Sequence, residues 1–379
     1  MTSRFAPLLW LAPLGCGGLA GAEEPVRLNQ VQVIGTHNSY HVAPHPNVLN
    51  LLGASGRVES RKLDYAHRPL ADQFTNLGVR QVELDVFADP DGGRYAEPAA
   101  RKILRGMGKD PGPDPDDRGQ LRPPGFKVFH IQDMDYLSTV PTLAGALRQV
   151  RDWSRGHPDH VPILVLVELK DNPIAGLPTR PAPFDRATLD AVDAAIFAAF
   201  EGGGLLTPDQ VRGDAPTLPE ALKTRGWPPL DQVRGRVLCA LDNEGATRDL
   251  YLDGHPALRG RAMFASVAPD HPAAAWMKVN DPVRDFDRIR DLVRAGFLVR
   301  TRADADTLEA RDNDTARRDK ALASGAQFVS TDYPESVAAV SAYRVRLPGD
   351  VVARANPVNG PAAPPGLDLE RRLEATSPP

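Results

Sequence analysis

Ionisable and amide side chains recur at the ends of short apolar segments in the first half of the chain. Six such residues stand at these positions: His37, Asn38, Glu83, Asp85, His130 and Glu168. A single histidine or acid at the end of a strand is more often a paired structural residue than a catalyst. Six of them at the ends of four successive segments favour a shared active site.

The carboxylates among these residues predict a cation site. Glu83 and Asp85 are two residues apart in "QVELDVF", so both point to the same face of a strand. Two carboxylates so close to each other, with Glu168 nearby, repel and raise each other's pKa unless a cation compensates. With the amide oxygen of Asn38 the donor set is all oxygen, which favours Ca2+ or Mg2+ over Zn2+.

The two histidines, His37 and His130, are then free for proton transfer or for contact with a charged oxygen. That combination suits attack on a phosphodiester. The metal and one histidine neutralise the charge that develops on phosphorus, while the other histidine protonates the leaving oxygen.

Three basic residues are candidates for contact with a substrate phosphate: Lys170, Arg300 and Arg302. For the two arginines, a structural ion pair with Asp304 or Asp306 is an equally good interpretation.

Eight short segments rich in β-branched residues must position these side chains, namely 31–34, 79–87, 126–131, 163–169, 236–241, 262–267, 297–300 and 327–330. Helical periodicity between them predicts helices within 141–158, 185–204, 283–297 and 314–328. This alternation predicts a (β/α)8 TIM barrel, somewhat distorted, rather than an open sheet. The candidate residues follow the C-terminal ends of its strands, where such barrels assemble their sites.

The N-terminal segment 1–22 has the three parts of a cleavable secretory signal: the basic Arg4, an apolar run over 5–14 and a small-residue exit. We therefore expect a secreted or periplasmic protein. A lipoprotein attached through Cys16 is the less favoured alternative, because Pro13 fits the lipidation motif poorly. After cleavage Cys239 would be the one remaining cysteine, so the exported protein would contain no internal disulfide.

The rest of the 379-residue chain is expected to form one barrel over 23–344. A Pro-, Gly- and Asp-rich insertion at 88–125 predicts a rim element or lid, and 345–379, with "PVNGPAAPPG", predicts a Pro-rich flexible tail. The formal net charge of -4 gives no general attraction to nucleic acid. No segment beyond the signal approaches the length of an integral membrane span.

The motifs "GTHNSYH", "VELDVF", "FH" and "LVELKD", in this order, resemble the catalytic barrel of the phosphoinositide-specific phospholipases C. The resemblance is closer to the secreted, calcium-dependent bacterial branch of that PLC-like phosphodiesterase superfamily. "VRTRAD" and "SGAQFVSTDYP" resemble its last two strands, so the resemblance covers residues 28–340.

The resemblance implies a role for each candidate. His37 would stabilise the pentacovalent phosphorus, His130 would be the general acid that protonates the diacylglycerol oxygen, and the Ca2+ ligands would be Asn38, Glu83, Asp85 and Glu168. The implied reaction is attack of the inositol 2-hydroxyl on phosphorus, which gives diacylglycerol and a cyclic inositol phosphate that water then opens. The substrate would be a phosphatidylinositol-like phospholipid at a membrane surface, and the enzyme a monomer.

Two alternatives stay open: a phosphodiesterase for glycerophosphodiesters or another headgroup, and a catalytically silent barrel that binds calcium or a phosphorylated ligand. "THNSYH" favours the first reading, because the glycerol-specific branch usually opens with His-Arg-Gly. Acidic character at Asp242 and Glu244 predicts an unphosphorylated inositol headgroup. The sequence shows no obvious hydrophobic rim, and residues 39–41 are expected to be loop structure.

Overall fold

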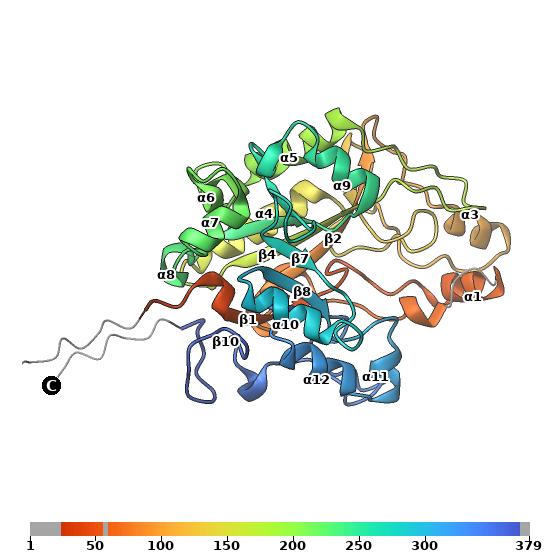
Figure 1. Ribbon diagram of the computed structural model, residues 1–379. Helices are drawn as coiled ribbons and strands as arrows, with labels where there is room; N and C mark the ends of the chain where they lie inside the picture. The colour runs from red at the N-terminus through yellow and green to blue at the C-terminus, as the bar shows by residue number, and fades with distance from the viewer. Residues whose placement is uncertain (1–23, 56–59, 372–379) are drawn as a thin grey trace, which may run out of the picture.

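Eight parallel strands form a nearly closed barrel in this computed structural model, which describes residues 24–55 and 60–371 (Figure 1). The strands follow one another around the barrel in the order β6-β5-β4-β2-β1-β9-β8-β7. Their bounds are β1 (Val31–Thr36), β2 (Gln81–Asp89), β4 (Ile163–Leu169), β5 (Val237–Leu241), β6 (Met263–Ala265), β7 (Trp276–Lys278), β8 (Leu298–Arg302) and β9 (Phe328–Thr331). A single bridge between Ser266 and Trp276 joins β6 to β7. The predicted (β/α)8 barrel is confirmed.

Helices surround the barrel, and the four predicted from periodicity are present as α4 (Leu143–Gly156), α5 (Arg186–Ala199), α10 (Phe286–Arg294) and α12 (Ala316–Ala323). The Thr142 and Asp185 side chains cap α4 and α5 by accepting bonds from backbone N–H groups three residues on. Shorter helices complete the layer: α2 (Leu70–Asn76), α6 (Pro208–Arg212), α7 (Leu218–Thr224), α8 (Leu230–Val233), α9 (Gly245–Leu252) and α11 (Leu308–Asp312). Single 3-10 turns occupy Leu28–Gln30, Ser60–Leu63, Pro256–Leu258 and Pro348–Asp350.

The central strands are covered on both faces, as the apolar runs of β4 and β5 require. Every residue of β5 is buried, and β4 departs from this pattern at Glu168. In β2 three of the nine buried residues are acids, Glu83, Asp85 and Asp89. A buried carboxylate needs a paired charge, a hydrogen-bond donor or a metal ion. The burial of these acids therefore indicates that the site lies along β2.

The third predicted strand, 126–131, is not part of the barrel. It forms β3 (Gly125–Val128), which pairs antiparallel with β2, with Asp89 opposite Gly125 and Val86 opposite Val128. The missed barrel strand is β7, which has only three residues and no β-branched run to reveal it. Because β3 runs back along β2, it returns the chain at His130 toward the level of the buried acids.

The C-terminal segment also differs from its prediction as a flexible tail. Residues 353–355 form β10 (Ala353–Ala355), antiparallel to the start of β1, and Leu369 is buried in the core. The reason is a gap in the barrel: β1 and β2 pair only at Gly35 and Gln81, which leaves the first half of β1 a free edge. Residues 372–379 lie outside the described residues, as do the predicted signal 1–22 and Cys16.

Two helices project at the end of the barrel where the strands finish. They are α1 (Pro46–Ser55), which follows β1, and α3 (Ala99–Gly106), which lies in the 88–125 insertion. Figure 1 shows both on the right, whereas α8 and β10 lie on the left. Among the described residues no helix is long and apolar enough to cross a membrane.

Candidate active site

The three predicted carboxylates meet where the middle of β2 lies beside the C-terminal end of β4. One side-chain oxygen each from Glu83, Asp85 and Glu168 lies within 4.8 Å of the others. The register explains this meeting, because Asp85 stands directly beside Glu168 in the parallel pair. The spacing of two residues within β2 then brings Glu83 to the same side of the strand.

Asn38 precedes Ser39, whose backbone N–H donates to the Glu83 carbonyl at 2.9 Å. The Asn38 backbone is left-handed (φ 44°), a conformation that asparagine tolerates better than most residues, in the turn that leaves β1. The side-chain amide group donates to the Tyr65 hydroxyl at 3.1 Å, which leaves the buried Oδ1 without a hydrogen-bond partner. An unpaired buried amide oxygen is suited to be a ligand of a hard cation such as Ca2+.

The carboxylate cluster is poorly neutralised by the protein. Burial raises the pKa of Glu83 to about 8, against the opposing effect of Arg300. Burial and the neighbouring Glu168 raise the pKa of Asp85 to about 7, although the Lys170 ammonium works against them. The Lys170 Nζ lies 3.1 Å from Asp85 Oδ2 and 3.0 Å from Glu168 Oε1. A divalent cation would supply the charge that these acids still lack.

These raised pKa values predict how stability responds to pH. Because Glu83 and Asp85 hold protons more tightly in the folded chain, the free energy of unfolding without calcium falls as pH rises from about 4 to about 8. Excess Ca2+ should reduce this fall, since it binds the ionised carboxylates. Calorimetric melting over this pH range, with chelator or with Ca2+, measures both slopes.

A second buried acid provides the internal reference for that experiment. Burial and the adjacent Asp332 raise the pKa of Asp304 to about 7. The hydrogen-bond partners of Asp304 are Thr331, Tyr343 and the backbone of Asp332. The contribution of Asp304 to the pH dependence of the free energy of unfolding should therefore not change with calcium. Equal slopes with and without Ca2+ would exclude the carboxylate cluster as a calcium site.

His37 follows β1 and is held from one side. Its Nδ1 lies 2.8 Å from Asp332 Oδ1, at the end of β9, and its Nε2 lies 3.7 Å from Glu83 Oε1. Burial and the nearby Arg302 lower the pKa of His37 to about 3, so the ring is neutral at neutral pH. Since a carboxylate only accepts, Asp332 favours the tautomer with hydrogen on Nδ1 and leaves Nε2 able to take up a proton.

The two candidate arginines have different surroundings. Arg302 lies 3.3 Å from His37 Nδ1 and 3.4 Å from Asp332 Oδ2, so its partner is neither of the acids expected from the sequence. Arg300 has a side chain that is 1% exposed and donates to Glu83, Ser330 and Asn280. Arg302 is therefore beside the reactive histidine, whereas Arg300 is committed to holding a carboxylate.

His130 follows β3 and is held by a nearby acid. Its Nδ1 lies 2.7 Å from Asp135 Oδ2, and its side chain is 21% exposed. Burial would raise the pKa of Asp135, but His41 and His130 lower it to about 2, so this carboxylate is ionised. A carboxylate at Nδ1 fixes the ring and places any transferable proton on Nε2.

His41 shares Asp135 and is part of the site rather than ordinary loop structure. Its Nε2 faces Asp135 at 2.9 Å, and its Nδ1 faces the Tyr65 carbonyl at 3.0 Å. His41 is fully buried and ties the carboxylate that holds His130 to the backbone at Tyr65.

Three residues that contact the candidate histidines or their carboxylates escaped the sequence analysis, namely His41, Asp135 and Asp332, and so did Lys278, the partner of Asp242. Asp135 stands five residues after His130 in "HIQDMDY", and Asp332 follows β9 in "VSTDYP". Both are acids just past a predicted strand, which is the signal that identified the other candidates. Lys278 ends the strand that was missed.

The segment after β5 changes the expectation about the headgroup. Asp242 accepts from the Lys278 Nζ at 2.9 Å. Asn243 bonds the backbone N–H and carbonyl of Leu169 at 2.7 and 2.9 Å, which ties β5 to β4. Of the three residues only Glu244 keeps an uncompensated charge, so repulsion of a phosphorylated headgroup does not follow from this segment.

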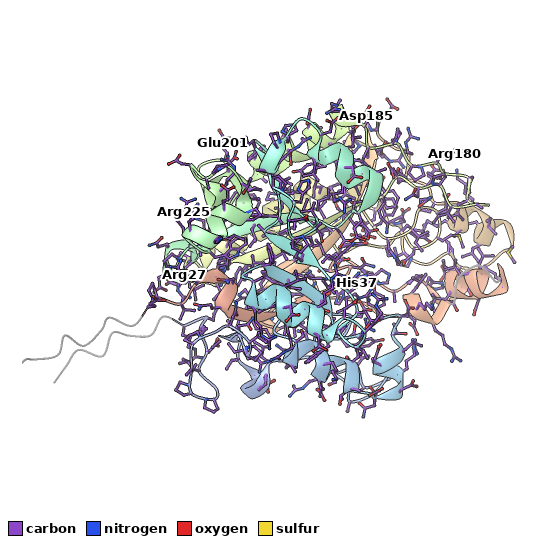
Figure 2. All side chains as sticks on the ribbon, in the orientation of Figure 1. Arg27, His37, Arg180, Asp185, Glu201 and Arg225 are labelled. Carbon is purple, nitrogen blue, oxygen red and sulfur yellow. The ribbon has the colours of Figure 1, made fainter. Side chains whose placement is uncertain are left out.

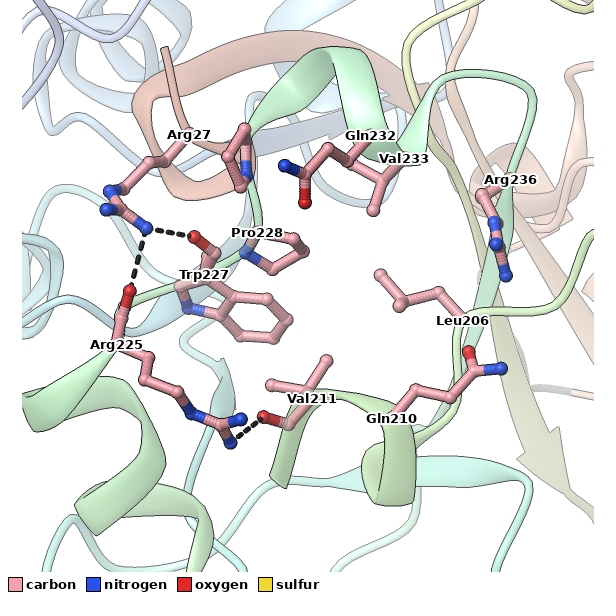
Figure 3. Close-up of a pocket in the computed structure, with 12 residues that line it drawn as sticks. Arg27, Leu206, Gln210, Val211, Arg225, Trp227, Pro228, Gln232, Val233 and Arg236 are labelled. Atoms are coloured by element: carbon pink, nitrogen blue, oxygen red, sulfur yellow. Dashed lines mark hydrogen bonds between the residues drawn. The ribbon is translucent and has the colours of Figure 1, made fainter. Parts of the chain in front are cut away.

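A separate pocket of about 480 Å³ lies at the opposite end of the barrel, lined in part by Arg27, Arg225 and Trp227 (Figure 3). Arg27 donates to the carbonyls of Arg225 and Trp227, so its guanidinium serves the local fold. Figure 2 shows Arg27 and Arg225 on the left, well away from His37. This pocket is not part of the site described above.

A barrel with a carboxylate cluster and two carboxylate-held histidines is suited to the hydrolysis of phosphoric diesters, and this is the class of the family that matches the chain. The family profile described as "Phosphoinositide phospholipase C, Ca2+-dependent" matches residues 26–357, and the chain belongs to this family. No match was found among the curated proteins.

Solved structures share the fold. The apo form of a calcium-dependent phosphoinositol-specific phospholipase C from Pseudomonas sp. matches with a TM-score of 0.50 and 17% identity, over 87% of this chain and 95% of that one. A Ca2+-dependent phosphatidylinositol-specific phospholipase C from Streptomyces antibioticus matches with a TM-score of 0.45 and 18% identity, over 81% and 95%. At this identity the Pseudomonas match shows the fold alone.

Proposed function

We propose that the protein is a calcium-dependent phospholipase C that cleaves phosphatidylinositol. The inositol 2-hydroxyl attacks phosphorus to give diacylglycerol and a cyclic inositol phosphate, which water then hydrolyses. The observation that carries this proposal is the meeting of Glu83, Asp85 and Glu168 within 4.8 Å, with His37 Nε2 only 3.7 Å from Glu83. Export from the cytoplasm through residues 1–22 and a monomeric state belong to the same proposal.

Asn38, Glu83, Asp85 and Glu168 would hold the calcium ion. A calcium ion held by these residues would lower the pKa of the attacking hydroxyl and neutralise charge on the phosphate. Arg300 keeps Glu83 in place, and Ser39 supports the same residue, since its hydroxyl accepts from the Glu83 N–H at 2.8 Å. Lys170, no longer needed to neutralise the cluster, can turn its ammonium hydrogens to the phosphate.

His37 acts on the side of the attacking hydroxyl. Held by Asp332 at Nδ1, it takes the proton of that hydroxyl on Nε2 once the anionic substrate phosphate beside it raises its basicity, and then, as an imidazolium, contacts a phosphoryl oxygen. Arg302 adds a fixed positive charge at the same place. His37 therefore has two proposed roles. It stabilises the pentacovalent phosphorus, as the sequence predicted, and it also transfers a proton.

His130 acts on the side of the leaving group. Asp135 orients its ring, so that Nε2 can deliver a proton to the diacylglycerol oxygen. In the second step the two histidines exchange roles, with His130 activating water and His37 returning its proton.

The headgroup preference can be tested with a panel of substrates. We expect diacylglycerol release from phosphatidylinositol vesicles in Ca2+, and little or no reaction with glycerophosphoinositol or phosphatidylcholine. Faster cleavage of glycerophosphoinositol than of the lipid would assign the protein to the alternative glycerophosphodiester activity. If the protein binds calcium but turns over no phosphodiester, the remaining interpretation is the catalytically silent barrel.

A further inference from the structure

The pocket at the end of the barrel opposite the candidate active site has walls from three parts of the chain (Figure 3). The segment that leads into β1 forms one wall together with the residues before α8. The Leu28 N–H donates to the Pro228 carbonyl at 3.1 Å, and the Leu230 N–H donates to the Val26 carbonyl at 2.7 Å. Helix α6 forms the facing wall. Its volume of about 480 Å³ is within the usual range for pockets that bind small molecules.

Apolar side chains form the floor of this pocket. Leu206, Val211 and Val233 are nearly buried, and Figure 3 shows the Trp227 indole pointing into the space that they surround. The indole is fixed in place, because its Nε1 donates to the Gly296 carbonyl at 2.9 Å. The floor therefore offers the apolar part of a ligand a surface with little competing polarity.

Every charged side chain that lines the pocket is positive. These side chains are Arg27, Arg225 and Arg236, and no acidic residue lines the pocket with them. Their hydrogen bonds go to backbone carbonyls, and none of the three forms a salt bridge within residues 24–55 and 60–371. A carbonyl accepts a hydrogen bond but supplies no negative charge. Three uncompensated guanidinium groups thus surround one apolar cavity.

Arg236 has the most hydrogen-bond donors to spare. In the described part of the chain it makes one hydrogen bond, to the Leu205 carbonyl at 3.4 Å, whereas Arg27 makes two at 2.7 Å. A guanidinium has five N–H donors, arranged to bind a carboxylate or phosphate through two of them. Figure 3 shows Arg236 on the same side of the cavity as Leu206 and across from Arg225. An acidic group bound to Arg236 would place the rest of its molecule over the apolar floor.

We propose that this pocket is a second binding site, for a small amphiphilic anion whose carboxylate or phosphate group binds Arg236 and whose apolar body lies on the floor. Arg27 and Arg225 favour the same ligand through their charge. Inorganic phosphate would leave the floor in contact with water, and an uncharged apolar molecule would leave the three arginines without a counter-charge. The proposal does not rest on the phospholipase function, because none of these residues belongs to the candidate active site.

Titration calorimetry with a matched set of probes tests the proposal. Octanoate and octyl phosphate carry the two acidic groups on the same chain, octanol lacks the charge, and inorganic phosphate lacks the chain. The buffer contains no calcium, and each probe stays below the concentration at which it forms micelles. We expect one molecule of octanoate or octyl phosphate to bind per chain, and octanol and phosphate to bind about 10-fold or more weakly. The tighter of the two anionic probes identifies the acidic group.

Two variants separate the charge of the pocket from its space. Arg236→Gln should weaken binding of the anionic probe by about 10-fold, because a charge-assisted hydrogen-bonded pair is lost. Gln232→Trp, at an exposed position of α8, should fill the cavity and prevent binding. Arg155→Gln is the matched control, since Arg155 also bonds a backbone carbonyl but lies outside this pocket. Its affinity for the probe should equal that of the wild type.

Four results would overturn the proposal. They are no binding of either anionic probe, equal affinity for octanol, unchanged affinity in Arg236→Gln, and full binding by Gln232→Trp. An equal loss of affinity in Arg155→Gln and Arg236→Gln would also overturn it, because the attraction would then be a general effect of positive charge. Calorimetric melting checks that each variant folds.

Discussion

Alanine in place of His130 lowers the turnover of phosphatidylinositol by about 10²- to 10⁴-fold, because the diacylglycerol oxygen then leaves without a proton. The effect should fall on kcat more than on KM, since His130 acts in the transition state. Steady-state kinetics on phosphatidylinositol vesicles in saturating Ca2+ measures both values.

The leaving group provides the control for this assignment. An inositol phosphodiester with a nitrophenyl leaving group needs no protonation, so His130→Ala should lose far less activity on it than on the lipid. Asp135→Asn should show the same pattern to a smaller degree, because it alters the residue that orients His130. An equal loss on both substrates would refute the role of His130 as the general acid.

Asp85→Asn raises the calcium concentration needed for half-maximal activity by about 10-fold or more, because a ligand loses its charge. Both oxygens of Asp85 lack a hydrogen-bond partner, and the ion pair with Lys170 is its one close polar contact among the described residues. The fold should therefore tolerate the change. Titration calorimetry with Ca2+ measures the affinity directly, and the melting temperature checks the fold.

Asp242→Asn is the control for this calcium effect. Asp242 is also a buried acid at the end of a neighbouring strand, but it is bound by Lys278 and lies outside the cluster. Because its charge also acts on Glu83 and Asp85 without belonging to the cluster, its replacement should change calcium affinity less than Asp85→Asn does. Global unfolding of Asp85→Asn would identify Asp85 as a structural acid, and unchanged calcium affinity would remove it from the ligand set.

The part of the site that could be predicted from sequence depends on one rule of parallel barrels. Glu83 and Asp85 on β2 lie beside Glu168 at the C-terminal end of β4, and the C-terminal ends of barrel strands meet at one face whatever the helices between them do. The same rule places His37 and Asn38 after β1. These residues needed only the strand pattern, which is a local property of the sequence.

The partners that tune the site could not be predicted in the same way. Asp332 lies 295 residues from His37, and only the closure of the barrel between β1 and β9 brings them together. His130 is positioned by β3, whose antiparallel course the apolar pattern does not distinguish from a parallel strand. The closure of the barrel and the direction of β3 are properties of the tertiary structure, and local sequence patterns do not reveal them.

Composition misled the prediction for the C-terminal segment. Its Pro- and Gly-rich sequence is typical of disorder, yet β10 supplies backbone hydrogen bonds that the widened gap between β1 and β2 leaves open. No pattern within residues 345–371 indicates that they pair with another strand. The unpaired edge that they cover belongs to β1, more than 300 residues earlier.

Phosphorus NMR of phosphatidylinositol vesicles incubated with the protein tests the central claim most directly. With Ca2+ the account predicts that cyclic inositol phosphate appears first and is then converted to inositol phosphate, whereas chelator prevents both products until Ca2+ is restored. Cleavage that continues in chelator, or inositol phosphate formed with no cyclic product at any time, would contradict calcium-dependent attack by the inositol hydroxyl.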